Sequence, residues 1–419
     1  MRRQGTAVLR YRDFALYLGS MFSTGMALYM ARVAIGWQVF HIRHHVLDLA
    51  WVSLAEFIPL PLLALPAGHL ADRLSRRMLL AAATALDTAV IAGLLVFTLR
   101  GPTVVWPFFA LAFGTGIASA LGAPAGRAMT PSLVPLELLS PAIAVRSIAS
   151  EVAAIVGPAL GGFLFFVRPG LVYEVSTALS FLSVVCILAM RAGREPAADE
   201  VPGLKSSFDG IRLIRRTPVM LGAISLDLFA VLLGGAVVLL PVFASDVLHV
   251  GTIGLGLLRS APAVGALAGS LLLVRRPIGR FAGRKMLTVV AAFGVCMVVF
   301  GLSRWMWLSL LALAVSGGVD VVSVVLRQTI LPFVTPDELR GRVNAVEMVF
   351  ISASNELGGF ESGVAAALIG TVPAVVFGGI ATIVIAAAWT RLFPDLANVD
   401  RLEDLRPVYA SPGVTSPDS

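Results

Sequence analysis

The sequence predicts an all-α membrane protein with twelve transmembrane helices in two six-helix bundles. Long apolar blocks, basic residues gathered at one set of block ends, and a sequence pattern that recurs in the second half support this prediction. Apolar residues make up 58% of the 419-residue chain and charged residues 14%. Soluble domains have about 45–50% apolar and about 25% charged residues, so little of this chain is left for a large soluble domain.

The apolar blocks have the length of membrane spans. The first block follows a basic start and is too long for the apolar region of a signal peptide. In the first half, spans are expected near 14–40, 49–70, 78–99, 103–126, 141–167 and 171–190. In the second half, they are expected near 218–245, 252–274, 286–303, 305–330, 343–369 and 372–393.

The basic residues indicate how the chain lies in the membrane. A net charge of +7 is compatible with nucleic acid or with a lipid bilayer as partner. The Arg residues lie at span ends rather than on one folded face, which favours the bilayer and argues against nucleic acid. If the N-terminus is cytoplasmic and the chain has these twelve spans, the loops on the outer side hold only four basic residues, Arg43, Arg100, Arg168 and Arg304. The positive-inside rule therefore predicts a multi-pass protein of the cell inner membrane with both termini cytoplasmic.

The expected organisation follows from one polar stretch between the halves. We expect an N-terminal six-helix bundle at 1–190, a cytoplasmic linker at 191–216, a C-terminal six-helix bundle at 217–395 and a polar cytoplasmic tail at 396–419. The linker contains an amphipathic segment that is expected to lie on the bilayer surface, with Leu204, Phe208, Ile211 and Ile214. The tail after Leu396 is expected to be disordered.

The two halves resemble each other weakly. Residues 276–287 repeat the basic pattern of residues 68–79, each after the second span of its half. Residues 336–346 likewise resemble residues 135–145. Parallel duplication of a six-span unit is known in one large class of transporters.

These motifs resemble the major facilitator superfamily over residues 13–395. Residues 68–77 are similar to its signature Gly-x-Leu-Ala-Asp-Arg-x-Gly-Arg-Arg, with Ser75 at a Gly position. Residues 156–162 resemble the Gly-Pro-x-x-Gly-Gly motif associated with exporters. Residues 335–343 and 239–262 resemble the subgroup with the enterobactin exporter and macrolide-efflux-like proteins, the transmembrane secretion effectors. The resemblance implies a monomeric transporter with a small-molecule substrate, protons as coupling ion, and neither cofactor nor metal.

Two of these motifs have a physical interpretation. In the first, Asp72 at a helix end can pair with a neighbouring Arg or face a helix N-terminus, worth roughly 1 kcal/mol. This predicts a conformational latch formed by Gly68, Asp72, Arg73, Arg76, Arg77 and Arg127; the alternative is a solvated turn. The second motif consists of Gly157, Pro158, Gly161 and Gly162. Its small residues permit close helix packing, and its proline permits a bend. The resemblance links this motif to a seal that favours outward export, and the alternative is ordinary helix packing.

Ionisable residues within the spans are candidates for function, because each costs on the order of 3 kcal/mol there. In the first half they are Arg32, Glu56, Asp87, Arg146, Glu151 and Glu174. In the second half they are Asp227, Arg259, Asp320, Arg327, Glu347, Glu356 and Glu361, with Asn355 beside them. Both signs are present, so several of them are expected to pair.

The proton and substrate candidates are chosen from this set. Glu56, Asp227 and Glu356 are predicted to handle protons or cations, because a carboxylate in an apolar cavity can exchange a proton near neutrality. Arg32 and Arg327 are predicted to bind substrate anions or carboxylates. Asp320 lies seven residues before Arg327, on the same helix face, and Asn355, Glu356 and Glu361 make the eleventh span unusually polar. The alternative for each residue is a structural ion pair.

The leading functional prediction is a proton-coupled exporter of siderophores or lipophilic drugs, and an importer or symporter is the alternative. All five His residues fall in predicted loops, His41, His44, His45, His69 and His249. That placement argues against a metal site and against a membrane-embedded enzyme. The chain also lacks a phosphate-binding loop of the Gly-Lys-Ser/Thr kind, which argues against direct coupling to ATP.

Overall fold

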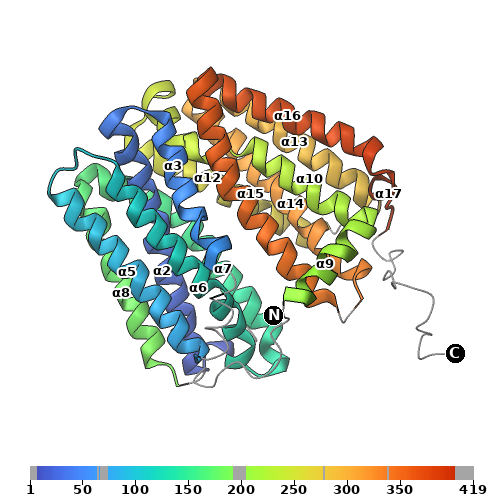
Figure 1. The fold of residues 1–419 in the computed structure, drawn as a ribbon, viewed down its shortest axis with the longest axis horizontal. Helices are drawn as coiled ribbons and strands as arrows, with labels where there is room; N and C mark the ends of the chain where they lie inside the picture. The colour runs from blue at the N-terminus through green and yellow to red at the C-terminus, as the bar shows by residue number, and fades with distance from the viewer. Residues whose placement is uncertain are drawn as a thin grey trace.

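The predicted apolar blocks form helices in the computed structural model (Figure 1). The block near 218–245 is divided into a long helix that ends at Gly234 and the short helical segments Ala236–Leu239, Leu240–Val242 and Phe243–Val247. The structure describes residues 7–63, 66, 74–191, 204–276, 279–336 and 339–401. The long helices of the first half are α2 (Arg12–Arg43), α3 (Val46–Phe57), α5 (Arg76–Leu99), α6 (Trp106–Leu133), α7 (Leu139–Val167) and α8 (Pro169–Ala189). Those of the second half are α10 (Pro218–Gly234), α12 (Gly251–Arg275), α13 (Ala282–Leu302), α14 (Met306–Val334), α15 (Arg340–Ile369) and α16 (Thr371–Leu392).

Helix ends follow local chemistry. Gly370 has a φ of 91° between α15 and α16, a backbone conformation that favours glycine. At the end of α2, His44 takes a φ of 49° and its N–H donates to the Phe40 carbonyl. The prediction that His41 lies in a loop is wrong, because α2 continues to Arg43. The His41 ring stacks on Trp37 with 4.0 Å between the ring centroids.

The predicted fold class is confirmed. The described residues are almost entirely helical and pack as two groups, one from each half of the chain. Buried clusters fill each group, one around Phe14, Tyr17 and Met129 in the first half and one around Met220, Met286 and Ile330 in the second.

The number of spans is a separate question. Within the described ranges, eleven helical segments are long and apolar enough to cross a membrane. Helix α15 is not among them, and it carries Glu347, Glu356 and Glu361 along its length. It has 30 residues and packs against α3, α10 and α16. The count of twelve therefore stays a prediction, and α15 is the helix on which it depends.

The two halves pack on each other at the end remote from the start of α2 (Figure 1). Helix α3 packs on α15 there, and α7 packs on α12. At Gly363 an added Cβ would lie only 2.6 Å from the Ala50 Cβ. Val33 of α2 belongs to the same buried cluster as Leu240 and Phe243 of the second half. A shared core thus closes this end of the molecule.

The segment between the halves differs in part from its prediction. Helix α9 (Leu204–Arg216) forms where the amphipathic segment was expected. Ile214 and its neighbour Leu213 are buried in the core of the second half, and α9 packs on α10 and α15. The prediction that this apolar face lies on the bilayer is therefore wrong for Ile214, because protein covers it. The side chains of Leu204 and Phe208 lie outside the described residues, and the domain boundaries stay a prediction.

The beginning of the tail also corrects the sequence interpretation. Leu396 of α17 (Pro394–Ala397) is fully buried, and Val399 is 8% exposed. The N–H groups of Gly283 and Ala282 donate to the carbonyls of Val399 and Asp400, at 3.0 and 3.1 Å. Predicted disorder is thus wrong for residues 397–401. This segment buries apolar side chains, and it accepts hydrogen bonds from the N–H groups at the start of α13, which have no partner within the helix.

Asp400 is the polar part of this contact. Its Oδ1 accepts the N–H of Phe281 at 2.9 Å, and its Oδ2 pairs with Arg280 Nη2 at 3.1 Å. Arg280 occupies the position that Asp72 has in the first half. The second half therefore obtains the carboxylate for this loop from the tail instead of from the loop itself.

The contact predicts a pH-dependent docking of the tail. The Phe281 N–H, and then Arg280, hold the Asp400 pKa below its ordinary value. A lowered pKa in the docked state means that the carboxylate stabilises docking above about pH 4 and loses this effect as the pH falls further. At neutral pH, Asp400→Asn is expected to raise the amide exchange rate of Ala282 and Gly283 several-fold. Asp395→Asn, at an exposed carboxylate of α17, is the control, and equal exchange in both variants would contradict the prediction.

Candidate functional site

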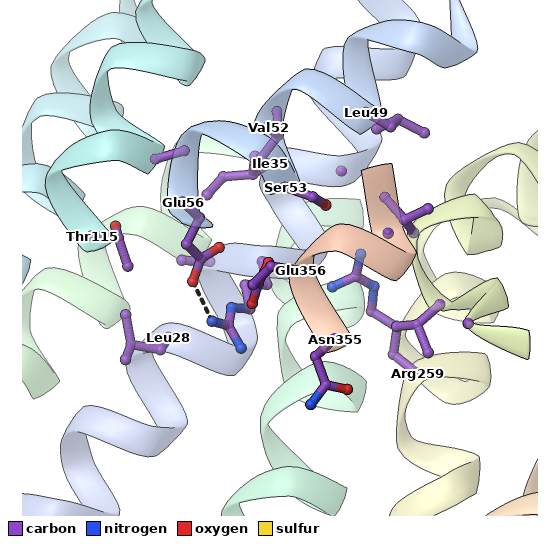
Figure 2. A pocket seen from close by; sticks show the side chains of 18 of the residues that line it. Leu28, Ile35, Leu49, Val52, Ser53, Glu56, Thr115, Arg259, Asn355 and Glu356 are labelled. Atoms are coloured by element: carbon purple, nitrogen blue, oxygen red, sulfur yellow. Dashed lines mark hydrogen bonds and ion pairs between the residues drawn. The ribbon is translucent and has the colours of Figure 1, made fainter. Parts of the chain in front are cut away.

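A cavity of about 400 Å³ lies between the two halves (Figure 2). Its walls come from α2, α3, α5 and α6 on one side and from α10, α12 and α15 on the other. Most lining side chains are apolar, as at Leu28, Ile35 and Val52. The polar lining residues are Arg32, Ser53, Glu56, Thr115, Arg259, Asn355 and Glu356. The cavity therefore combines apolar walls with a few charges.

Arg32 and Glu56 form an ion pair on the first-half wall. Arg32 comes from α2 and Glu56 from α3, the next helix along the chain. The Arg32 side chain is 43% exposed, and the Glu56 side chain is 15% exposed. Leu28 and Arg32 also line a second cavity of about 310 Å³, which continues along α2 past Gly25 to Tyr17. Free space therefore extends from the ion pair toward the end where α2 begins.

Asn355 and Glu356 bring the second-half wall to the same cavity. The Asn355 Nδ2 donates to the Ile351 carbonyl one turn earlier, at 2.9 Å. Glu356 interacts electrostatically with Arg32 and Glu56. Within the described part of the chain, Glu356 has neither an ion pair nor a hydrogen bond. Four of the sequence-predicted residues, Arg32, Glu56, Asn355 and Glu356, are thus brought together around one cavity.

Arg259 is a lining residue that the sequence interpretation did not assign to the site. It lies on α12, and its guanidinium is directed into the cavity (Figure 2). The Nε atom is buried and has no hydrogen-bond partner among the residues that the structure describes. The sequence indicated only that an Arg lies within a span, and its lack of a partner depends on the packing of α12 against α2 and α7.

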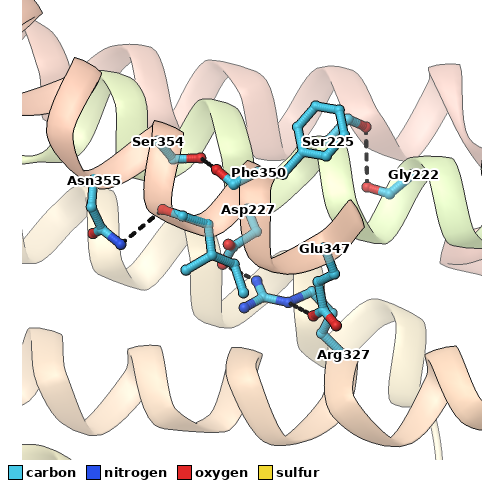
Figure 3. Close-up of polar contacts among 9 residues, drawn as sticks. Gly222, Ser225, Asp227, Arg327, Glu347, Phe350, Ser354 and Asn355 are labelled. Atoms are coloured by element: carbon cyan, nitrogen blue, oxygen red, sulfur yellow. Dashed lines mark hydrogen bonds and ion pairs between the residues drawn. The ribbon is translucent and has the colours of Figure 1, made fainter. Parts of the chain in front are cut away.

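A second charged group lies inside the second half (Figure 3). Arg327 of α14 pairs with Asp227 of α10, and its Nε donates to Glu347 Oε1 at 2.9 Å. The Arg327 side chain is 3% exposed, and each carboxylate is 11% exposed. None of the three lines the central cavity. The structure therefore places Asp227 and Arg327 in a buried ion-pair triad.

Asp320 and Glu361 lie elsewhere. Asp320 lines a separate cavity of about 10 Å³ together with Asp227 and Ser323, which is about the space of one water molecule. Arg327 pairs with the two other carboxylates rather than with Asp320, although they share a helix face. Glu361 accepts the Ser362 hydroxyl at 3.4 Å and does not line the central cavity.

Comparison with known proteins identifies the family. The family described as Transmembrane secretion effector matches residues 5–412. This chain belongs to that family. Enterobactin exporters EntS from Citrobacter koseri and from Escherichia coli O81 are each 27% identical to it over 281 residues, which is 67% of either chain.

Solved structures show the same fold for this secretion effector. A POT family transporter in complex with 5-aminolevulinic acid has a TM-score of 0.73 at 12% identity, covering 92% of this chain and 96% of that one. A bacterial homologue of Spinster in an inward-facing, unoccupied conformation has a TM-score of 0.70 at 14% identity, covering 92% and 98%. The chain is thus a multi-pass membrane transporter of the major facilitator type, and these relatives are transporters rather than enzymes.

The latch motif of the secretion effector is described only in part. Gly68, Asp72 and Arg73 lie outside the described residues, as does the side chain of Arg127. Arg77 Nε donates to the Ile187 carbonyl at 3.1 Å, and Arg76 Nη1 donates to the Ala128 carbonyl at 3.4 Å. These two residues tie the start of α5 to α8 and α6. The pairing of Asp72 stays a prediction.

The exporter motif lies between three helices. An added Cβ at Gly157 would lie 2.7 Å from the Tyr29 Cβ, and one at Gly161 would lie 2.8 Å from the Met30 Cα. Both glycines therefore let α7 approach α2. Gly162 faces the other half instead, where its added Cβ would lie 2.3 Å from the Thr252 carbonyl oxygen. One motif thus serves packing within the first half and contact between the halves.

Pro158 takes part in the same contact. Its carbonyl oxygen would lie 2.5 Å from a Cβ added to Gly256 on α12. Gly162 and Gly256 thus allow the backbones of α7 and α12 to touch, as small residues do where membrane helices approach closely.

Proposed function

We propose that this secretion effector exports a small molecule across the cell inner membrane by alternating access, with protons moving inward in exchange. The single observation that carries this proposal is Glu356 in the cavity between the halves, a carboxylate without an ion pair among the residues that the structure describes. The enterobactin exporters among its relatives support the outward direction. The apolar walls favour a siderophore or a lipophilic drug as the transported molecule.

In the proposed orientation, this conformation is the one that takes up substrate from the cytoplasm. With both termini in the cytoplasm, as the positive-inside rule predicts, the closed end between α7 and α12 faces outward. The free space then extends from the cavity toward the cytoplasm, along α2 as far as Tyr17. A substrate would enter from the cytoplasm, and export would require the contact of Gly162 with α12 to separate.

Glu356 is proposed as the proton carrier because the other carboxylate of the cavity, Glu56, already has an ion-pair partner. Glu56 is paired with Arg32, so its charge is already balanced. An ionised Glu356 competes for the same Arg32, and a proton removes this competition and leaves the Arg32–Glu56 pair intact. Entry of one proton down a 100 mV potential supplies about 2.3 kcal/mol. The latch residues and a monomeric state are part of the same proposal.

Transport in everted vesicles tests the proposal. The transported member of a panel of enterobactin, ethidium and norfloxacin is identified first, and its accumulation is expected to fall when a protonophore is added. Glu356→Gln is expected to lower the protonophore-sensitive part by up to about 50-fold, the equivalent of 2.3 kcal/mol. Glu361→Gln, on the same helix but outside the cavity lining, is the control and is expected to stay within about twofold of the parent.

Two outcomes would refute parts of the proposal. Accumulation that is indifferent both to the protonophore and to Glu356→Gln would rule out proton antiport. Net uptake into right-side-out vesicles, driven by an inward proton gradient, would support an importer or symporter instead.

A further inference from the structure

Arg259 differs from Arg32 and Arg327, two other arginines within the spans. Arg32 is paired with Glu56, and Arg327 is paired with Asp227 and Glu347. Among the residues that the structure describes, Arg259 has no ion pair or hydrogen bond, and its Nε is buried. A guanidinium nitrogen taken out of water without a partner is costly. The position is therefore suited to an anionic group that arrives from elsewhere.

The location of Arg259 defines where such a group would lie. An added Cβ at Gly36 would be 3.2 Å from Arg259 Nη2 and 3.0 Å from the Pro241 Cγ. Gly36 and Pro241 belong to the closed end, where the halves share a core. The guanidinium therefore lies at the deep end of the cavity, and an entering molecule reaches it last.

Glu356 is the matching unpaired charge of opposite sign. It lines the same cavity from α15, whereas Arg259 lines it from α12. In Figure 2, Glu356 lies between Glu56 and Arg259. The structure contains no contact between Glu356 and Arg259 within the described residues. Two opposite charges thus face one apolar space, and neither neutralises the other.

We propose that the transported molecule is a zwitterion with an apolar body, whose anionic group binds Arg259 and whose cationic group lies at Glu356. This inference rests on the proposed function and names its substrate class. The apolar middle of the molecule packs on Ile35, Val52 and Val238 of the lining. Charge-assisted contacts of a guanidinium with a carboxylate are among the strong hydrogen bonds of proteins.

The two charges have different roles in transport. A proton and an ammonium group compete for Glu356, because either one neutralises its carboxylate. The other charged groups facing Glu356, Arg32 and Glu56, balance each other. Arg259 stays positively charged throughout and selects the anionic end. A proton therefore replaces the cationic end of the substrate on the return step, which is the exchange that antiport requires.

Norfloxacin is a suitable probe, since its ammonium and carboxylate groups lie at opposite ends of an aromatic body and it is fluorescent. N-acetylnorfloxacin keeps only the negative charge, and norfloxacin ethyl ester keeps only the positive charge. Binding of the three is measured by fluorescence anisotropy on the full chain in nanodiscs of neutral lipid. Norfloxacin is expected to bind at least about tenfold more tightly than either derivative, a tenfold change in Kd being 1.4 kcal/mol.

Variants assign each charge to its residue. Arg259→Gln is expected to remove the advantage of norfloxacin over its ester, and Arg259→Lys is expected to retain part of it. Glu356→Gln is expected to remove the advantage over N-acetylnorfloxacin. Arg275→Gln on α12 and Glu361→Gln on α15 are the matched controls, since neither residue lines the cavity. Thermal melting of each variant shows that it is folded.

The results separate this inference from the proposed function. Equal affinity for the three probes, absence of saturable norfloxacin binding, or an equal loss for all three in Arg259→Gln would overturn the zwitterion inference. Proton-dependent efflux could still persist in each case and would leave the proposed function standing. Charge-selective binding without any proton-dependent flux would overturn the antiport proposal instead.

Discussion

Replacing Arg327 by Met is expected to lower the free energy of unfolding by about 3–5 kcal/mol, the usual cost of breaking a buried ion pair. Arg327 is 3% exposed and is the partner of both Asp227 and Glu347. Its loss leaves two carboxylates together in a low-dielectric interior. The protein should then melt at a markedly lower temperature in detergent, as measured by the loss of the monodisperse peak after heating.

Removing the whole triad is the informative comparison. Arg327→Met combined with Asp227→Asn and Glu347→Gln is expected to recover most of the lost stability, because no unpaired charge remains. Arg275→Met, at the exposed end of α12, controls for the loss of an arginine. If the single and triple variants melted alike, the triad would not be the source of the stability, and a role for Asp227 in proton transfer would regain support.

Gly162→Ala is expected to prevent closure of the end where α7 meets α12, and to abolish transport with little loss of folded protein. The added Cβ would lie 2.3 Å from the Thr252 carbonyl oxygen, a distance at which the two backbones must separate. Because that contact joins the halves, the strain can be relieved by opening the interface. Each bundle keeps its own core.

Labelling from outside the cell measures this opening. Thr115→Cys lines the cavity and is introduced after Cys186→Ser and Cys296→Ala remove both native thiols. Gly162→Ala is expected to increase its reaction with a membrane-impermeant maleimide. Gly19→Ala on α2 is the control, since an added Cβ there meets nothing within 4 Å. Unchanged labelling together with wild-type transport would show that the contact does not seal the cavity.

Gly317→Ala provides a second comparison, with the opposite expectation. Its Cβ would lie 1.9 Å from the Pro262 carbonyl oxygen, but this contact joins α14 to α12 inside the second half. No opening between the halves relieves it, so this variant is expected to lose folded protein. The effect of replacing a glycine of a span by alanine thus depends on which helix the glycine faces, which the sequence does not show.

Much of the fold was predictable because the bilayer imposes a local rule. A span must be long, apolar and helical to satisfy its backbone in lipid, and these properties can be read from consecutive residues. The spans expected at 14–40, 141–167 and 372–393 accordingly appear as α2, α7 and α16, with ends shifted by only a few residues. Helix α15 is the exception, since its acidic residues weaken the signal that the rule uses.

The linker and tail could not be predicted in the same way. The sequence showed that Ile214 is apolar and that the segment after Leu396 is polar. Whether lipid or protein covers Ile214, and whether the N–H groups of α13 attract Asp400, depends on helices that are distant along the chain. Local composition has no information about such partners.

The helical membrane fold, the family motifs and the set of charges within the spans follow from the order of the residues alone. Which of these charges are paired follows from the packing of the helices: Glu56 pairs with Arg32, and Arg327 pairs with two carboxylates. Within the described ranges, Arg259 and Glu356 pair with none. The physical reason is that the cost of a charge in the membrane is local, whereas its compensation depends on distance in space. Helices far apart in the chain set that distance when they pack.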